Sequence, residues 1–515
     1  MADDSREKTG DHDQNPGDKY ALIRKAGMYG PMHYLFQELG IQSNLIVAAT
    51  YSSVDASLLT PPAIFEALRT VISRHPALGI IGVVQPSEKK RGNHRLWEAR
   101  LDKIILEDIV EFVDIGGSDL NGIIERAHNE WFTQDGSRPL WKLLVVHTRH
   151  ILFVCHHMIA DGRSGYTFHQ SLLAALNDVE TTQKTMHQSD DKVVTVTVPS
   201  TAPPEHSVAL VQEKLSMALL IWFFLWWKVI RLIFSNSSLL FSDASFNKTY
   251  PTLDKPFPKG DRTVTRVESL RIECELKEKC LEACRSHDTT LTALIQTLIQ
   301  VTLAADIYPE ATLGFSRVAI DLRRYLSPNP GATTMIDASA SFADTQLLQK
   351  YRQAVNARDT SLQDFKASED HMDVPLVWKL ASQNRHRLHN DLTKRHRALQ
   401  EYMSGTTLGE DIEDFISQGF PNLGLFSNNS FLISNLGEFQ VGEQQVSSGW
   451  KISHVEFSVA ATRACFGNAG TVFNVASVNG GDLVINLSFE DGVLKPQSVK
   501  KLLDGVAKRL NLLIS

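Results

Sequence analysis

Two adjacent histidines, His156 and His157, follow an apolar run and precede an Asp-Gly pair in VCHHMIADGRSG, residues 154–165. An imidazole has a pKa near neutrality, so it can accept a proton from a bound hydroxyl or amine as a general base. The preceding residues 150–155, HILFVC, have the pattern of a buried strand. Because neighbouring side chains of a strand point to opposite faces, only one imidazole can face a given cavity. Gly162 is interpreted as the residue that permits a turn before the next helix.

Three other interpretations of this pair stay open. Both histidines could be buried structural residues. A metal site of His157 and Asp161 would need further ligands, and nothing nearby has the spacing of a metal motif, so we expect no metal. Cys155 lies on the same strand face as His157, which makes a Cys-His nucleophile pair conceivable. Two such residues are roughly 6–7 Å apart along a strand, which is too far for direct activation of the thiol.

The composition is that of a globular protein. The chain has 515 residues, of which 43% are hydrophobic and 22% charged. Its net charge of −7 and the lack of a long basic run argue against nucleic-acid binding. The 5 cysteines are too sparse for a disulfide framework, so we expect a reducing compartment. Residues 1–19 are polar, lack a secretory signal pattern and are expected to be disordered.

The hydrophobic pattern divides the rest of the chain into two α/β halves joined by a linker. The first half, residues 20–178, is predicted to contain a strand at 44–51, a helix at 60–78, two strands within 139–157 and a helix at 165–177. The second half, residues 266–515, is predicted to contain a buried helix at 288–305 capped by Asp288, two strands within 471–489 and an amphipathic helix at 496–514.

The linker, residues 179–265, contains one strongly apolar segment at 216–234. Its run from Met217 to Trp227 is unbroken, and Lys228 and Arg231 then interrupt it. A membrane-spanning helix needs about 20 apolar residues, whereas tryptophans such as those of this segment favour the membrane interface. We therefore expect a helix that lies in the plane of a membrane surface. A buried core helix and a re-entrant hairpin are the alternatives.

The histidine stretch HHMIADG, residues 156–162, resembles the His-His-x-x-x-Asp-Gly signature of the CoA-dependent acyltransferase superfamily. Three further stretches are similar to this superfamily in order and distance: SRHPAL at 73–78, AIDLRRYL at 319–326 and FLISNLGEF at 431–439. The SNLG stretch resembles the fungal alcohol acetyltransferase branch, and the sequence contains no Asp-Phe-Gly-Trp-Gly, the late signature of plant-type enzymes.

This resemblance implies a chloramphenicol-acetyltransferase-like fold of the α/β (α+β, two-layer) class, with two similar halves around a central channel. It implies that His157 is the general base and that Asp161 is a structural, orienting residue paired with Arg323. Ser434 and Asn435 are the implied candidates for hydrogen bonds to an oxyanion in the channel. His156 and Gly162 complete the motif.

The implied function is an acyl-CoA-dependent alcohol O-acyltransferase, with acetyl-CoA as the expected co-substrate and no bound cofactor. The acceptor would be a small alcohol or a hydroxyl of a secondary metabolite, esterified by direct transfer. Two alternatives remain: an N-acyltransferase or condensation-type amide former, and a catalytically idle membrane-associated scaffold of the same fold. We expect a cytoplasmic monomer with peripheral contact to endoplasmic reticulum or lipid-droplet membrane through 216–234.

Overall fold

The computed structural model describes residues 19–27, 29–85, 96–114, 119–183, 195–200, 207–211, 214, 216–233, 258–356, 372–400, 403, 430–440, 449–462, 470–492 and 494–514. The disorder predicted for residues 1–19 falls on 1–18, which lie outside the described residues, and on Lys19. Much of the predicted linker also lies outside them.

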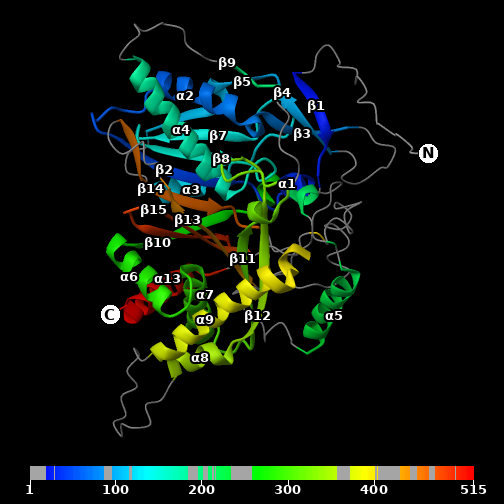
Figure 1. Cartoon of the computed structure of the whole chain (residues 1–515), viewed down its shortest axis with the longest axis vertical. Helices are drawn as coiled ribbons and strands as arrows, with labels where there is room; N and C mark the ends of the chain where they lie inside the picture. Colours follow the sequence, from blue (N-terminus) through cyan, green and yellow to red (C-terminus); the bar gives the residue numbers. More distant parts are fainter. Residues whose placement is uncertain are drawn as a thin grey trace, which may run out of the picture.

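A five-stranded sheet forms the core of the first half, shown in the upper part of Figure 1. Its order is β14 (Trp450–Val459), β2 (Leu45–Ser53), β8 (His150–Cys155), β7 (Trp141–Val146) and β6 (Val110–Val113). Helices α2 (Pro61–Arg74) and α4 (Gly162–Gln183) cover one face, and α3 (Leu120–His128) covers the other. Because both faces are covered, β2 and β8 are continuous apolar runs rather than alternating ones.

A six-stranded mixed sheet forms the core of the second half. Its order is β10 (Thr265–Ile272), β16 (Leu483–Glu490), β15 (Thr471–Val478), β13 (Ser430–Phe439), β11 (Leu313–Asp321) and β12 (Ser339–Leu347). The helices packed on it are α6 (Cys274–Ser286), α7 (Leu291–Thr302), α8 (Gln349–Asn356), α9 (Val374–Asn390) and α13 (Pro496–Ile514). Helix α7 is buried on nearly all sides, and its polar residues Gln296 and Gln300 donate to Ser316 Oγ inside the core.

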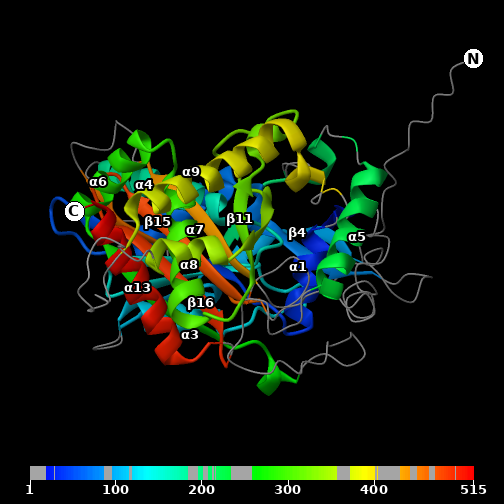
Figure 2. The same ribbon diagram turned by 90° about the horizontal axis from the view of Figure 1, so that it is seen from below.

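The smaller elements lie at the edges of the two halves. The first half also contains a three-stranded sheet of β1 (Tyr20–Lys25), β4 (Leu96–Leu101) and β3 (Ile80–Val84), and helix α1 (Tyr29–Glu38). Strands β5 (Lys103–Ile105) and β9 (Thr195–Thr197) pair with each other. Helix α5 (Met217–Ile233) lies at the periphery, outside the sheets (Figures 1 and 2).

One strand joins the two halves. Strand β14 belongs to the second half of the sequence, yet it pairs antiparallel with β2, from Trp450 opposite Ser53 to Val459 opposite Leu45. Its end also contacts the second sheet, because the Val459 backbone N–H donates to Asn474 Oδ1 at 3.2 Å. The halves are therefore tied by main-chain pairing as well as by side-chain contacts.

The predicted elements are found with small shifts, but the predicted helix cap is wrong. Asp288 does not cap the buried helix α7; Thr290 does, and its side chain accepts a hydrogen bond from the Ala293 backbone N–H. Asp288 has a φ of 47°, a left-handed conformation that asparagine and aspartate tolerate better than most residues. The chain therefore turns at Asp288 before α7 begins at Leu291.

No single helix among the described residues has both the length and the apolar composition to cross a membrane. Helix α6 and the helical segment Leu291–Ile307 meet that test only when taken together, and they are bent by 98° relative to each other.

Candidate active site

The two histidines of the motif have different surroundings. His156 is buried, with 1% of its surface exposed, and its Nδ1 accepts a hydrogen bond from the Met158 backbone N–H at 3.0 Å. Burial, with His33 and His157 as further causes, lowers the pKa of His156 well below its usual value. His156 is thus a neutral structural residue, as one of the alternative interpretations supposed for the pair.

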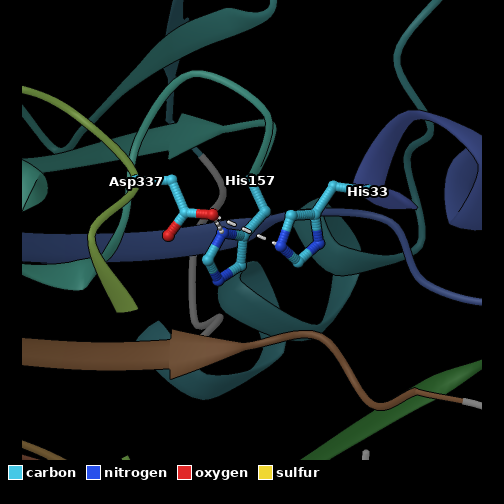
Figure 3. Close-up of side chains that lie close together, drawn as sticks. All are labelled: His33, His157 and Asp337. Atoms are coloured by element: carbon cyan, nitrogen blue, oxygen red, sulfur yellow. Dashed lines mark ion pairs between the residues drawn. The ribbon is translucent and has the colours of Figure 1, made fainter. Parts of the chain in front are cut away.

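His157 lies in the turn between β8 and α4, next to His33 of α1 and Asp337, which precedes β12 (Figure 3). Asp337 Oδ2 is 3.6 Å from His157 Nδ1 and 3.5 Å from His33 Nε2. The two imidazole rings are stacked, with centroids 4.0 Å apart and planes inclined by 8°. The His157 side chain is 18% exposed. Its second nitrogen, Nε2, points away from Asp337 (Figure 3).

The two imidazole rings share the single carboxylate of Asp337, and this sharing sets the charge of each of the three groups. Burial lowers the pKa of His33 to about 4, and repulsion from His157 adds to this effect, so His33 is neutral at pH 7. Burial is the largest single influence on His157 and opposes its charge, but attraction to Asp337, hydrogen bonding and the Asp161 carboxylate together outweigh it and raise the pKa. Burial would raise the pKa of Asp337, yet His157 and His33 hold it below its usual range. The stable arrangement is a carboxylate beside one basic and one neutral imidazole.

Their donor atoms lie close enough together to suggest a metal site. However, a metal bound by imidazole nitrogens lies close to the plane of each ring, along the nitrogen lone pair. The nearly parallel, stacked planes of His33 and His157 provide no such common point. The arrangement instead fits two imidazole rings that each face one carboxylate through a ring nitrogen at ion-pair distance.

Asp337 is positioned by its two chain neighbours, which form the 336–338 segment with it. The Ile336 backbone N–H donates to Ser164 Oγ at 3.1 Å, and Ser164 Oγ–H donates back to Ile336 O at 2.8 Å. The Ala338 backbone N–H donates to Asp161 Oδ2 at 3.0 Å. The first turn of α4 and the residue before it thereby hold this segment from both sides of Asp337.

Asp161 and Arg323 form a buried, bidentate ion pair between the halves. Arg323 Nη1 donates to Asp161 Oδ2 at 2.8 Å, and Nη2 donates to Oδ1 at 3.0 Å. Both side chains are 5% exposed. Burial would raise the pKa of Asp161, but Arg323 lowers it below its usual value. Arg323 Nη2 also donates to Ile336 O at 3.0 Å, so the pair that the resemblance implied also holds the 336–338 segment.

Gly162 is needed for a different reason from the predicted one. Its φ is not in the left-handed region, so the interpretation of a turn that only glycine allows is wrong. A Cβ at this position would lie 2.6 Å from Leu436 Cδ2 and 2.8 Å from Phe457 Cζ. Glycine therefore permits α4 to approach β13 and β14 closely. Arg163 Nη1 strengthens the contact by donating to Leu436 O at 3.0 Å.

The two predicted oxyanion donors, Ser434 and Asn435, lie on β13. Asn435 Nδ2 donates to Thr292 Oγ1 at 2.9 Å, and its Oδ1 accepts from the Gly437 backbone N–H at 2.8 Å. No hydrogen bond is found among the described residues between either side chain and His157, and their role as oxyanion donors stays a prediction from the resemblance.

The Cys-His alternative does not fit the structure. Cys155 is completely buried, and burial, with Asp161 as a second cause, raises the pKa of its thiol well above the usual value. A thiol that stays protonated is a poor nucleophile.

Sequence reasoning missed His33 and Asp337. His33 is an isolated histidine on a helix, and Asp337 follows Ile336 in a stretch without helical or strand periodicity. Neither has a motif that points to chemistry. The one available signal was that Asp337 lies shortly after the AIDLRRYL stretch in the sequence. Arg323 of that stretch donates to the backbone of Ile336, the neighbour of Asp337.

The chain belongs to the alcohol acetyltransferase family, whose model matches residues 25–509. It is 24% identical over 394 residues to a probable alcohol acetyltransferase, FCK4, of Fusarium pseudograminearum, a match that covers 71% of this chain and 70% of that protein. The family membership predicted from the four motifs is thus confirmed, and it supports an acyltransferase activity.

Solved structures confirm the predicted fold. TRI3 trichothecene 15-O-acetyltransferase from Fusarium sporotrichioides superposes with a TM-score of 0.65 at 11% identity, over 96% of this chain and 95% of that one. The first condensation domain of the CDA synthetase gives a TM-score of 0.58 at 13% identity, over 96% of both chains. At these identities the similarity concerns architecture: two chloramphenicol-acetyltransferase-like halves that together span the chain.

Proposed function

We propose that the protein transfers an acyl group, preferably acetyl, from acyl-CoA to an alcohol hydroxyl, with His157 as the general base. The observation that carries this proposal is the geometry of His157. Its Nδ1 faces Asp337, and its Nε2 points away from that carboxylate. A histidine held in this way keeps one nitrogen available to take a proton.

The reaction proceeds by direct transfer in this scheme. His157 Nε2 removes the hydroxyl proton as the alcohol oxygen attacks the thioester carbonyl carbon. The tetrahedral intermediate collapses with cleavage of the carbon–sulfur bond, and the CoA thiolate takes the proton back from the imidazolium. Asp337 stabilises that imidazolium because its carboxylate lies beside Nδ1.

The family membership supports acyl-CoA and an alcohol as substrates. Acceptors of two sizes fit the proposal: small alcohols, and a hydroxyl on a larger secondary metabolite. The structural similarity to an enzyme described as a trichothecene 15-O-acetyltransferase is the specific reason to keep the second class. We propose that the protein acts as a monomer, because both halves of one chain contribute to the site.

Product analysis tests this proposal. The purified protein is incubated with acetyl-CoA and a panel of alcohols and matched amines, and products are identified by mass spectrometry alongside thiol release. We expect an ester and free CoA in equal amounts. An amide as the main product would favour the N-acyltransferase alternative, and thiol release without either product would indicate a thioesterase. A protein that releases no thiol with any acceptor would fit the idle-scaffold alternative.

We further propose that helix α5 attaches the protein to a membrane surface in the cytoplasm, on endoplasmic reticulum or lipid droplets. Large apolar side chains of α5 are exposed, among them Ile221 at 57%, Leu225 at 54% and Leu232 at 86%. Trp222 and Trp226 are also exposed and stack on each other with centroids 5.8 Å apart. This exposure does not fit the alternative of a buried core helix, and it is the pattern of an interfacial helix.

The ion pair between the halves restricts how α5 meets a membrane. Asp161 precedes α5 in the sequence and Arg323 follows it, yet their side chains are bonded. A single crossing at α5 would place these residues on opposite sides of the bilayer. Helix α5 therefore lies in the interface rather than across it in this proposal.

Charge placed on the exposed face of α5 should abolish membrane binding. We expect the wild-type protein to sediment with vesicles of phosphatidylcholine and phosphatidylserine and the double variant I221E/L225E to remain in the supernatant, because glutamates on this face cannot enter the lipid interface. The control V54E/L347E changes two exposed apolar residues elsewhere, at 65% and 57% exposure, and should sediment like wild type. Equal sedimentation of I221E/L225E and wild type would contradict attachment through α5.

A further inference from the structure

We propose that Asp337 is a positioning residue for the transfer reaction: it holds His157 through Nδ1 so that Nε2 faces the acceptor hydroxyl, and His33 keeps its carboxylate in place. This inference rests on the proposed role of His157 as the base. It assigns functions to two residues that have no place in the HHxxxDG motif.

The distance between the carboxylate and His157 is the first support. At 3.6 Å the separation is that of an ion pair and slightly exceeds an ordinary N–H···O hydrogen bond. His157 Nδ1 is buried and makes no hydrogen bond in the structure. Catalytic hydrogen bonds are often long without substrate and shorten in the reacting complex. Asp337 is therefore the acceptor to which His157 Nδ1–H can donate a hydrogen bond when substrate occupies the site.

The second support is the way the structure fixes Asp337. Its neighbours Ile336 and Ala338 are bonded to Ser164 and Asp161, as described above. A carboxylate without a positioning role would not require hydrogen bonds from the backbone of both of its chain neighbours. The buried ion pair of Asp161 consequently acts on the reaction at a distance, since it places the 336–338 segment and with it the carboxylate that faces His157.

The third support is the neutral, stacked His33. Its Nε2 lies 3.5 Å from Asp337 Oδ2, while its ring covers one face of the His157 imidazole. With a pKa of about 4, His33 stays uncharged at pH 7 and can donate its Nε2–H to the carboxylate. The stack restricts rotation of the His157 ring. When the cluster takes up a proton, the positive charge therefore resides on His157 rather than on His33.

The pH dependence follows from the groups around the base. The titratable and charged groups that face or influence His157 among the described residues are His33, His156, Asp161, its partner Arg323, and Asp337. Burial works most strongly against the charged form of His157, but Asp337 together with a backbone hydrogen bond and Asp161 outweighs it, so the pKa is raised above the usual value of 6.5. The base must be neutral to accept a proton. Activity therefore rises with pH through this raised pKa, and loss of the Asp337 charge moves the rise to lower pH.

The test is the pH profile of kcat/KM for D337N beside wild type. We expect kcat to fall by about 10²- to 10⁴-fold with little change in KM for acetyl-CoA, because the ring loses its orientation and its imidazolium loses stabilisation. The acidic limb of the profile should move to lower pH. A limb that stays in place or moves upward would overturn the inference, whatever the loss of activity.

A second readout does not depend on turnover. The pKa of His157 can be measured by NMR titration of the imidazole signals, with the His157 resonance identified by its absence in H157A. It should lie above 6.5 in wild type and lower in D337N. If D337N does not fold, D337E retains the charge on a longer side chain; it should keep the pKa of His157 above 6.5 while kcat falls at least about tenfold. Wild-type kcat in D337E would overturn the inference.

Variants of His33 separate its two contacts. H33Q retains a donor toward Asp337, whereas H33F retains a stacked ring without a donor. We expect H33Q to keep a higher kcat than H33F, and the reverse order would overturn the role of His33 in keeping the Asp337 carboxylate in place.

A failure of this inference is distinguishable from a failure of the proposed function. Activity in H157A would reject the base itself, whereas an inactive H157A with a wild-type profile in D337N would reject only Asp337.

Discussion

The variant H157A is expected to form ester about 10²- to 10⁴-fold more slowly than wild type, measured as kcat/KM with acetyl-CoA and an accepted alcohol. The imidazole Nε2 is directed away from Asp337 (Figure 3), and the proposed mechanism places the acceptor hydroxyl on that side. Alanine removes this imidazole, and His33, the other histidine of the cluster among the described residues, has its Nε2 facing Asp337. Binding of acetyl-CoA should change little.

The matched control for H157A is H386A. His386 is also ion-paired, with Asp288 at 2.9 Å, but it is 53% exposed on α9. Its replacement should leave kcat/KM at the wild-type value. Both variants should retain the wild-type circular dichroism spectrum. An H157A protein that is folded and within a factor of a few of wild-type activity would contradict the proposed mechanism.

The variant D161N is expected to cause the largest loss of stability, about 3–5 kcal/mol in the free energy of unfolding. It leaves the buried Arg323 guanidinium without its bidentate partner, and among the described residues Asp321, at 3.1 Å, is the counter-charge that remains. The loss should appear as a lower midpoint in urea denaturation. The activity of the folded fraction should fall as well, because Ala338 loses the carboxylate that accepts its N–H.

The control for D161N is D504N, which makes the same change in an exposed ion pair. Lys500 and Asp504 lie one helical turn apart on α13 at 78% and 63% exposure, and such pairs contribute at most about 0.5 kcal/mol. The double variant D161L/R323M removes both buried charges, so it should recover stability relative to D161N without recovering activity. Similar denaturation midpoints for D161N and D504N would show that the buried pair is not structural.

The strand, turn and helix that hold His157 are local features, and sequence could predict them. An apolar run gave β8, and the helical periodicity of 165–177 gave α4. The amphipathic pattern of 496–514 gave α13 for the same reason. Each of these depends on side chains within a few residues of one another. Family resemblance then selected His157 from the pair, which strand alternation by itself could not do.

The remainder of the site depends on contacts between distant segments. His33 lies on α1, His157 after β8 and Asp337 before β12. No local sequence pattern predicts that these three residues lie close together. The requirement for glycine at 162 likewise comes from Leu436 and Phe457 on other strands. Strand β14 shows the same limit at the level of topology, because its pairing with β2 is set by packing of the two halves.

A single rapid-quench experiment tests the central claim most directly. Wild-type protein and H157A are mixed with labelled acetyl-CoA and an accepted alcohol, and ester, free CoA and the intact protein mass are measured over one turnover. We expect wild type to form ester and CoA together with no acetylated protein, and H157A to form neither on that timescale. An acetylated protein that precedes the ester, or ester formation by H157A at the wild-type rate, would contradict direct transfer with His157 as the base.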